Sequence, residues 1–280
     1  MTGDPLGVRA ASAAIMASAE DVSLGPVDAA VAELRDRPVP AWDRRRHYEG
    51  PRLVEYLLVL DTVNFSFWGG EVGGYWQLAE RLRDAFVAGT PLWDPAFLRE
   101  IDAAALERLI GRFPLLDERA AALRELGSAG DDLGSLVGST AVETARRLAR
   151  LSSFDDRPFL KRAQIVPADL WGAGVRSFTD IAELTCFADY KLPQVLRHAG
   201  VVVYSERLAR RVDDWVELAA GSLEETEIRA ATVVAVDLIR DRLADLGRPL
   251  VAVEVDWMLW AWSQGVFPVR PHHRTRTIFY

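Results

Sequence analysis

The chain has 280 residues, 50% of them hydrophobic, so it is long enough to bury a large core in one domain, with room for two lobes. Its formal net charge of −8 and sequence pI near 5.2 argue against a general polynucleotide binder, because phosphate neutralisation by basic residues supplies most non-specific affinity. A small phosphorylated substrate remains compatible with this charge, since it needs only a local cluster of donors.

Cysteine content and apolar runs limit the surroundings in which the chain works. The single cysteine, Cys186, cannot form an internal disulfide and cannot build a zinc site alone. The longest apolar runs, such as 57–60 and 201–204, are too short to span a bilayer. Residues 1–20 lack the basic start and apolar centre of a signal peptide. We therefore expect a cytoplasmic protein with no membrane segment.

Hydrophobic spacing in the first half of the chain indicates successive helices. Apolar residues recur at helical intervals, and the predicted helices cover 29–34, 52–61, 76–87, 97–110, 117–126 and 141–151. Asp94 followed by Pro95 has the form of a helix N-cap with proline at the first helical position. The Gly- and Asp-rich stretch 127–138 is the best candidate for a hinge, which would place a lobe boundary near 127–140.

The stretch 154–174 interrupts this pattern. Proline and glycine recur in it and helical periodicity fails, so we expect an irregular loop with at most a short strand at 164–166. Helices are predicted again over 179–187, 192–199, 205–219, 222–246 and 255–262. Ser222 and Glu225 fit a capping box at the start of one of them.

The predicted fold class follows from what this order of elements lacks. No internal repeat and no alternation of strands with helices is visible, which argues against Rossmann and barrel architectures. We expect an all-α protein with an N-terminal helical segment over 1–38 and a single globular domain over 39–280.

One acidic residue lies directly after an apolar stretch in the sequence CFADYKLP, residues 186–193. Pro193 can begin a helix, which places Asp189 at a helix junction. A carboxylate near a helix N-terminus can stabilise the positive charge that develops on a sugar during glycosidic cleavage. The structural alternative is that Asp189 only caps the helix that begins at Leu192.

A second acidic residue stands in one of the most apolar and aromatic stretches, VEVDWMLWAW at 253–262. Buried acids are costly unless they are paired or used. Asp256 can accept two hydrogen bonds from the N1 and 2-amino groups of a guanine-like base, with Trp257 or Trp260 as a stacking surface. The structural alternative is that Asp256 starts a helix whose tryptophans belong to the core.

Basic residues that can hold a phosphate occur in three places. The C-terminal run PHHRTR supplies His272 and Arg274, the run RRRH ends in His47, and Lys161 is one of only two lysines. The structural alternative for the C-terminal run is pairing with the protein's own excess of acid. We expect no metal site, because two adjacent histidines lack carboxylate partners at helical spacing.

Five motifs in a fixed order are more specific together than any one of them. They read DTVNFSFW at 61–68, FADYKLPQ at 187–194, GSLEETEIRA at 221–230, VDWMLW at 255–260 and PHHRTR at 271–276. As a set they resemble the queuosine salvage protein family, the queuosine 5′-phosphate N-glycosylase/hydrolases, over roughly residues 39–280. The resemblance implies an all-helical fold related to helical DNA glycosylases. It also implies hydrolysis of the N-glycosidic bond of queuosine 5′-monophosphate without a cofactor, releasing queuine for reuse in tRNA modification.

The resemblance also assigns roles to residues. It makes Asp189 the catalytic carboxylate at the anomeric carbon and Asp256 the reader of the guanine-like edge. Because the 7-deaza base has no N7 to protonate, its departure needs hydrogen bonds elsewhere and stacking, for which Phe187, Phe65 and Trp68 are candidates. The other candidate substrate contacts are Asn64, Tyr190, Trp257, Trp260, Lys161, His47, His272 and Arg274.

Two other functions stay open at this point. A helical DNA glycosylase would use a lysine and an aspartate, but the acidic charge and the absence of a helix-hairpin-helix glycine motif before Asp189 count against it. A non-catalytic module that stores or senses queuosine would bind without turnover. The expected partner is a small-molecule substrate, with no polynucleotide and no membrane.

Overall fold

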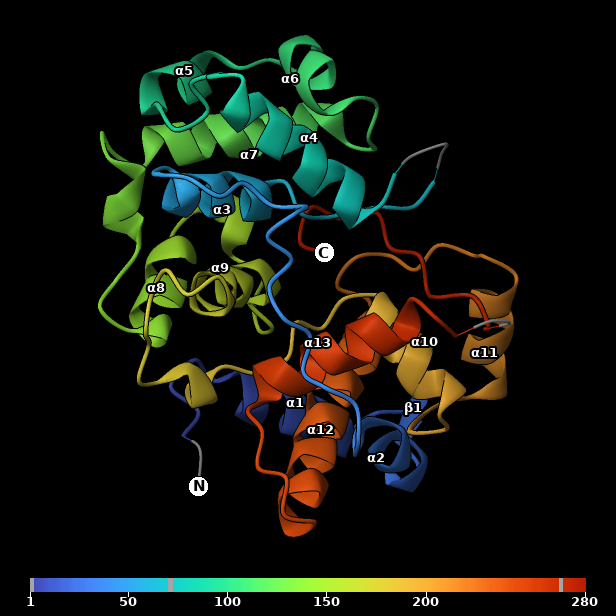
Figure 1. The fold of residues 1–280 in the computed structure, drawn as a ribbon. Helices are drawn as coiled ribbons and strands as arrows, with labels where there is room; N and C mark the ends of the chain where they lie inside the picture. The colour runs from blue at the N-terminus through green and yellow to red at the C-terminus, as the bar shows by residue number, and fades with distance from the viewer. Residues whose placement is uncertain (1–2, 70–72, 267–268) are drawn as a thin grey trace. The chain divides into compact units, whose positions relative to one another are not determined.

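The structure is a computed structural model that describes residues 3–69, 73–266 and 269–280. Within these ranges it contains thirteen α-helices, three short 3-10 helices and one two-stranded sheet, which confirms the predicted all-α class (Figure 1). The chain forms two compact units, each assembled from separate segments. Unit 1 consists of Met1–Pro40, Arg157–Lys161 and Asp180–Arg276, and unit 2 of Ala41–Asp156, Arg162–Thr179 and Thr277–Tyr280.

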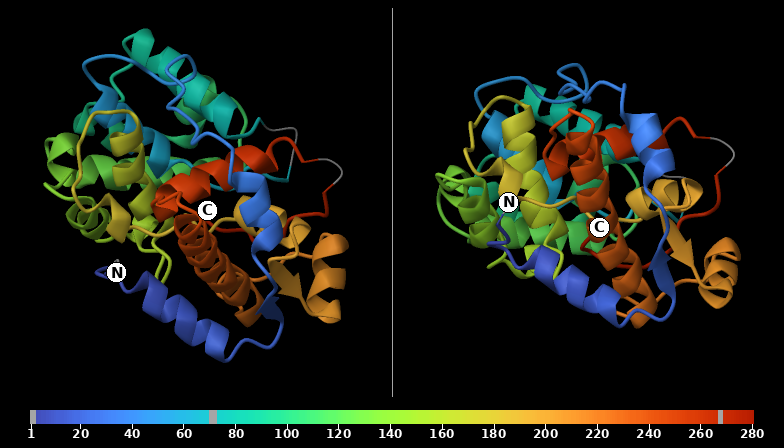
Figure 2. Two further views of the ribbon diagram at one scale, coloured as in Figure 1. Left: turned by 60° about the horizontal axis from the view of Figure 1, so that its bottom comes forward. Right: turned by 90° about the horizontal axis from the view of Figure 1, so that it is seen from below.

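Unit 1 is organised around its longest helix, α12. Helix α1 lies along α12, and α10, α12 and α13 pack against one another (Figures 1 and 2). Fully buried apolar residues such as Ile228, Val236 and Leu259 form the core between these helices. The elements are α1 (Val8–Ala17), β1 (Val22–Leu24), α2 (Asp28–Leu34), η3 (Ile181–Glu183), α10 (Lys191–His198), β2 (Val202–Tyr204), α11 (Glu206–Asp213), α12 (Leu223–Asp245) and α13 (Ala252–Ser263). Strands β1 and β2 pair antiparallel with Val22 opposite Tyr204, and both contact α12.

Unit 2 is a stack of shorter helices. Helix α3 packs against α4 and α7, and α7 also packs against α5 and α6 (Figure 1). Apolar residues such as Leu58, Leu82 and Leu123 are fully buried there. The elements are α3 (Leu53–Thr62), α4 (Tyr75–Val87), α5 (Pro95–Glu100), α6 (Ala103–Ile110), α7 (Leu116–Ser128), η1 (Leu133–Leu136), α8 (Ala141–Leu148), η2 (Ser152–Phe154) and α9 (Lys161–Gly172), whose first residue belongs to unit 1.

Two predicted helix starts are confirmed in atomic detail. Asp94 accepts a hydrogen bond from the Ala96 N–H at 2.9 Å, with Pro95 as the first residue of α5. Ser222 accepts from the Glu225 N–H at 3.4 Å, but the Glu225 carboxylate bonds the Gly221 N–H at 3.1 Å rather than that of Ser222. The cap is therefore present, with its reciprocal bond one residue earlier than in a standard capping box.

The predicted loop over 154–174 is wrong, because α9 occupies most of it. Ala163, Val166 and Leu170 are fully buried, and so is the polar Gln164, which leaves the helix without the exposed face that produces a periodic pattern. Pro167 lies inside the helix. A buried helix that contains proline has the same sequence pattern as an irregular loop.

The predicted helix over 179–187 is also wrong. Only the short η3 turn forms there, and 184–189 is neither helix nor strand. Side chains from other elements bond the backbone of this segment, as described below, so tertiary contacts override its apolar spacing. The helix predicted over 97–110 is divided into α5 and α6, because Asp102 caps a new helix by accepting from the Ala105 N–H at 2.7 Å.

The stretch expected as a hinge, 127–140, lies within unit 2 and contains the η1 turn. The division of the chain into 1–38 and 39–280 stays a prediction. Among the helices that the structure describes, none is both long and apolar enough to cross a membrane.

Candidate active site

Asp189, the predicted catalytic acid, stands at the N-terminus of α10. Its Oδ1 accepts hydrogen bonds from the N–H groups of Lys191 and Leu192 at 2.7 and 3.0 Å, so the capping role is confirmed. The side chain is half-buried, and its Oδ2 accepts no hydrogen bond from the described residues. One oxygen therefore fixes the orientation of the carboxylate, and the other can face a ligand.

Asp256 lies inside α13 rather than at its start. The helix begins at Ala252, so the alternative that Asp256 starts and caps this helix is wrong. The residue is 4% exposed, and its Oδ2 accepts the Phe187 N–H at 2.7 Å. Its Oδ1 has no hydrogen-bond partner in the described part of the chain. Asp256 thus bonds the backbone two residues before Asp189, and one short segment of chain ties the two acids together.

Burial and nearby groups act in opposite directions on the pKa of Asp256, and burial has the largest effect. Burial raises the pKa of Asp256 well above its ordinary value, and the nearby Asp189 charge adds to this rise. The Phe187 N–H and the charge of Lys161, which is 5% exposed, act in the opposite direction on that pKa. Hydrogen-bond donors favour the charged form of a carboxyl group. The donors of a bound base would therefore lower the raised pKa of Asp256.

The C-terminal basic run lies beside aromatic rings in unit 1. The ring of His272 is 4.5 Å from that of Tyr190 and meets the Trp215 ring edge-on at 5.6 Å. The guanidinium of Arg274 lies 3.8 Å from the centre of the Trp215 ring. Burial lowers the pKa of His272 to about 4, so this imidazole is neutral at physiological pH.

Sequence reasoning missed Trp215 as part of this cluster. It is 43% exposed and has a φ of 61°, an unfavourable value for a bulky residue. The backbone next to it is fixed, since the Leu218 N–H donates to the Arg274 carbonyl at 2.8 Å. A lone tryptophan between acidic residues carries no sequence signal for this position.

Two of the three tryptophans in α13, Trp257 and Trp260, are candidate stacking surfaces, and both are half-buried. Trp260 also packs against the hydrophobic core of unit 1. Their role in stacking on a base stays a prediction. In the residues that the structure describes, no group of three His, Cys, Asp or Glu side chains is arranged to hold a metal ion.

Four predicted site residues belong to unit 2, three of them in the segment after α3. Asn64 is buried and donates from Nδ2 to Asp61 Oδ1 at 3.3 Å. Phe65 is fully buried, with the guanidinium of Arg119 4.4 Å and that of Arg162 4.8 Å from its ring centre. A base cannot stack on a fully buried ring unless the segment moves. Trp68, by contrast, is half-buried.

His47 is the fourth of these residues, and both of its ring nitrogens are engaged. Nδ1 is 2.8 Å from the Asp43 carbonyl and Nε2 is 2.8 Å from the Tyr75 hydroxyl. The ring stacks on Trp42 at 3.8 Å, and burial lowers the pKa of His47. Contact with a phosphate would require breaking one of these bonds, and that role stays a prediction.

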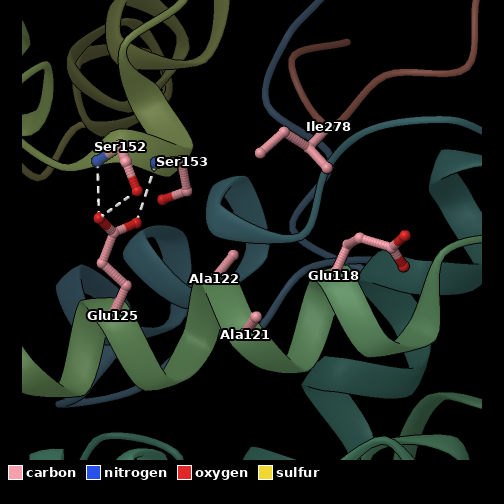
Figure 3. Close-up of a pocket in the computed structure, with 7 residues that line it drawn as sticks. All are labelled: Glu118, Ala121, Ala122, Glu125, Ser152, Ser153 and Ile278. Carbon is pink, nitrogen blue, oxygen red and sulfur yellow. Dashed lines mark hydrogen bonds between the residues drawn. The ribbon is translucent and has the colours of Figure 1, made fainter.

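A cavity of about 300 Å³ lies elsewhere in unit 2 (Figure 3). Its lining residues are Glu118, Ala121, Ala122, Glu125, Ser152, Ser153 and Ile278, none of which is a candidate site residue. Glu125 caps η2 there by accepting from Ser152 N at 2.6 Å and Ser153 N at 2.9 Å. Burial raises the pKa of Glu125, but the hydrogen bonds from Ser152 and Ser153 lower it by more, so the pKa lies below its ordinary value. Its carboxylate therefore has a structural use.

Comparison with known proteins gives a consistent result. The family model described as queuosine salvage protein matches residues 45–146 and 151–280. A protein of Sphaerobacter thermophilus described as queuosine 5′-phosphate N-glycosylase/hydrolase is 40% identical over 99% of this chain and 99% of its own length. Proteins with the same description from Dictyostelium discoideum and Mus musculus are 36% and 28% identical, over 81% and 99% of this chain and 78% and 100% of theirs. The chain therefore belongs to the queuosine salvage protein family.

Proposed function

We propose that this protein hydrolyses the N-glycosidic bond of queuosine 5′-phosphate and releases queuine. The observation that carries the proposal is the Asp189 carboxylate, which has one oxygen fixed by two backbone N–H groups and the other without a hydrogen-bond partner among the residues that the structure describes. As the bond from C1′ to the base nitrogen breaks, positive charge develops at C1′. In this proposal Asp189 Oδ2 faces C1′ and stabilises that charge, and water completes the hydrolysis.

Asp256 is proposed to bind the base. Its Oδ2 is engaged by Phe187, and its Oδ1 can accept donors from the guanine-like edge of queuine. These hydrogen bonds would hold the base in one orientation, so that C1′ meets Asp189. They do not stabilise the negative charge that builds on the departing base, because an anionic base is a weaker donor to a carboxylate. Phe187 and Tyr190, which flank Asp189, are the proposed apolar contacts, with Trp257 and Trp260 as further candidates.

The 5′-phosphate and the ribose are assigned to Lys161, Arg274 and His272. Lys161 and Arg274 supply positive charge, and neutral His272 can supply only a hydrogen bond. His272 Nδ1 is 2.7 Å from the His273 carbonyl and is therefore its protonated nitrogen, which leaves Nε2 as an acceptor at neutral pH. We therefore place His272 against a ribose hydroxyl and the two cations against the phosphate. In unit 2, Asn64, Trp68, His47 and Phe65 stay predicted substrate contacts.

The test is direct detection of the products. The purified protein is incubated with queuosine 5′-phosphate, queuosine or guanosine 5′-phosphate, and free base is measured by mass spectrometry. We expect queuine from the first substrate and no guanine from the last. If queuosine 5′-phosphate remains intact while a family relative run in parallel cleaves it, the proposal is wrong. Family membership favours this hydrolase over a DNA glycosylase or a non-catalytic binding protein.

A further inference from the structure

The segment 184–189 is neither helix nor paired strand, so no regular secondary structure supplies hydrogen-bond partners for its backbone N–H and C=O groups. Most of it is buried, from Leu184 through Ala188. Buried backbone groups without partners are costly, so other parts of the fold must supply them. The segment also carries Asp189 at its end, so the same partners determine where the proposed catalytic acid stands.

Arg229 of α12 binds this segment next to Asp189. Its Nε donates to the Ala188 carbonyl at 2.9 Å, and that carbonyl belongs to the peptide bond joining Ala188 to Asp189. The side chain is only 3% exposed, and its guanidinium lies 4.2 Å from the centre of the Phe159 ring. Glu225, one helical turn earlier and 2% exposed, faces Arg229 at 3.5 Å.

Arg9 of α1 binds the beginning of the same segment. It donates to the carbonyls of Glu183 and Leu184 at 2.9 and 2.8 Å, and its Nε donates to Asp237 at 2.9 Å. The first forty residues, which carry no predicted site residue, therefore support the site indirectly. Together with Asp256 on the Phe187 N–H, three charged side chains bond three backbone groups of the segment and the Glu183 carbonyl just before it.

We propose that Arg229 is a positioning residue that holds the peptide plane before Asp189 and thereby aims its carboxylate at the sugar. This inference rests on the proposed function. A buried Arg–Glu pair is not in itself a reason for stability, since well-packed apolar residues often replace one without loss. Its use here is directional, because the Nε–H has one fixed geometry relative to the Ala188 carbonyl. Displacing a reacting group by about 1 Å can cost about 10²-fold in rate.

The variant pair Glu225→Gln with Arg229→Met removes the clamp while leaving no buried charge behind. We expect kcat to fall by about 10²-fold with a small change in KM, because substrate contacts remain and orientation is lost. Arg229→Lys keeps the charge but not the Nε donor, and it should retain the melting temperature yet lose most of kcat. Arg197→Met is the matched control, since it removes a buried guanidinium of α10 that pairs with the partly exposed Asp213 of α11 and, among the described residues, has no bond to the segment. It should lower the melting temperature and leave kcat unchanged.

The deciding measurement is the same clamp removal in an Asp189→Asn background, followed by single-turnover release of base with enzyme in excess. If Arg229 acts through Asp189, the further loss is less than about twofold, because the two changes are not additive. An equal fold-loss in both backgrounds, or a wild-type kcat in Arg229→Lys, would overturn the proposal.

Hydrogen exchange separates this proposal from the proposed function. The peptide covering 181–192 should exchange faster when the clamp is removed, whatever the substrate is. Unchanged exchange there would reject the clamp even if queuine is released. Failure of the wild-type protein to release queuine, with the exchange difference present, would instead reject the substrate assignment.

Discussion

Two segments of the chain are held in the same way but serve different ends. In unit 2 the segment 61–66 has its carbonyls bonded by Arg119, which reaches Val63, Phe65 and Ser66. In unit 1 the segment 184–189 has its carbonyls bonded by Arg9 and Arg229. A guanidinium with five donors suits this task, because it can bond several carbonyls that no secondary structure pairs.

The two segments differ in how far their residues are buried. Residues 61–66 are all buried, and Arg119 contacts the rings of Phe65 and Phe67, so this segment builds core. The segment in unit 1 ends in Asp189, which is half-buried and has one oxygen that accepts no hydrogen bond from the described part of the chain. By our proposal, the same device stabilises packing in one unit and orients a catalytic carboxylate in the other. Substitutions in each segment test this division.

The largest effect is expected from Asp189→Asn. Asparagine caps a helix as well as aspartate does, so α10 keeps its N-terminal hydrogen bonds and the melting temperature should stay unchanged. The charge facing the sugar is lost, and kcat should fall by about 10³-fold, as when a preorganised electrostatic contact is removed. Asp189→Ala should lose the same activity and also about 1 kcal/mol of stability. An Asn variant with normal kcat would refute the catalytic role.

Arg119→Met tests the core-building segment. Removing this fully buried guanidinium takes its donor from four carbonyls, three in the segment and that of Pro114, and the free energy of unfolding should drop by about 3–5 kcal/mol. Urea unfolding gives this value. If the segment 61–66 only builds core, the kcat of the molecules that remain folded should stay within about twofold of wild type, whereas a larger loss would support Asn64 and Phe65 as substrate contacts. A selective loss of kcat at full stability would erase the contrast between the two segments.

Asp256→Asn tests the charge that reads the base. The raised pKa of Asp256 means that wild-type kcat/KM should increase with pH as this carboxyl deprotonates. The Asn variant lacks this rise and presents an amide donor to the base, so kcat/KM should fall by about 10- to 10²-fold.

Stability should move in the opposite direction in Asp256→Asn. A carboxyl whose folded pKa is raised favours folding below its unfolded pKa, and that contribution is lost as pH rises toward the folded value. The variant should therefore melt higher than wild type near neutral pH, and the gap should close toward pH 4. A wild-type rise in kcat/KM that survives in the variant would assign the titration to another group.

The sequence allowed some of this arrangement to be predicted, and the reasons are local. Pro193, shortly after Asp189, indicated the helix junction. Each of the two acids lies in a motif only a few residues long, so the motif can be recognised in the sequence. The bond from Asp256 to Phe187 joins positions 69 residues apart, and nothing local encodes it. The carbonyl bonds from Arg9 and Arg229 also join positions far apart in the sequence, 174 and 41 residues, which is why apolar spacing over 179–187 predicted a helix that tertiary contacts prevent.

The sequence also does not show which segments of the chain form each unit. Thr277–Tyr280 belongs to unit 2 although the residues just before it belong to unit 1. The Ser66 N–H donates to the Tyr280 carbonyl at 2.9 Å, a contact across more than two hundred residues of sequence. Composition and periodicity indicate that helices form, and only packing decides which of them share a core.

The smallest predicted effect concerns acid stability. Burial lowers the pKa of His272 to about 4 and that of His273 to about 3, both below the ordinary value near 6.5. Each histidine therefore supports folding fully above its unfolded pKa, and this contribution declines as pH falls toward the folded value. A shift of this size in His272 corresponds to at most about 3 kcal/mol.

Between pH 7 and pH 5, the melting temperature of His272→Gln should accordingly fall by less than that of wild type. Thermal unfolding at both pH values measures this. It should leave the pH dependence of kcat/KM above pH 6 unchanged, because His272 is already neutral there. A variant that flattens that profile would show that His272 titrates during turnover, and the imidazole would then belong to the proton-transfer steps rather than to ribose binding.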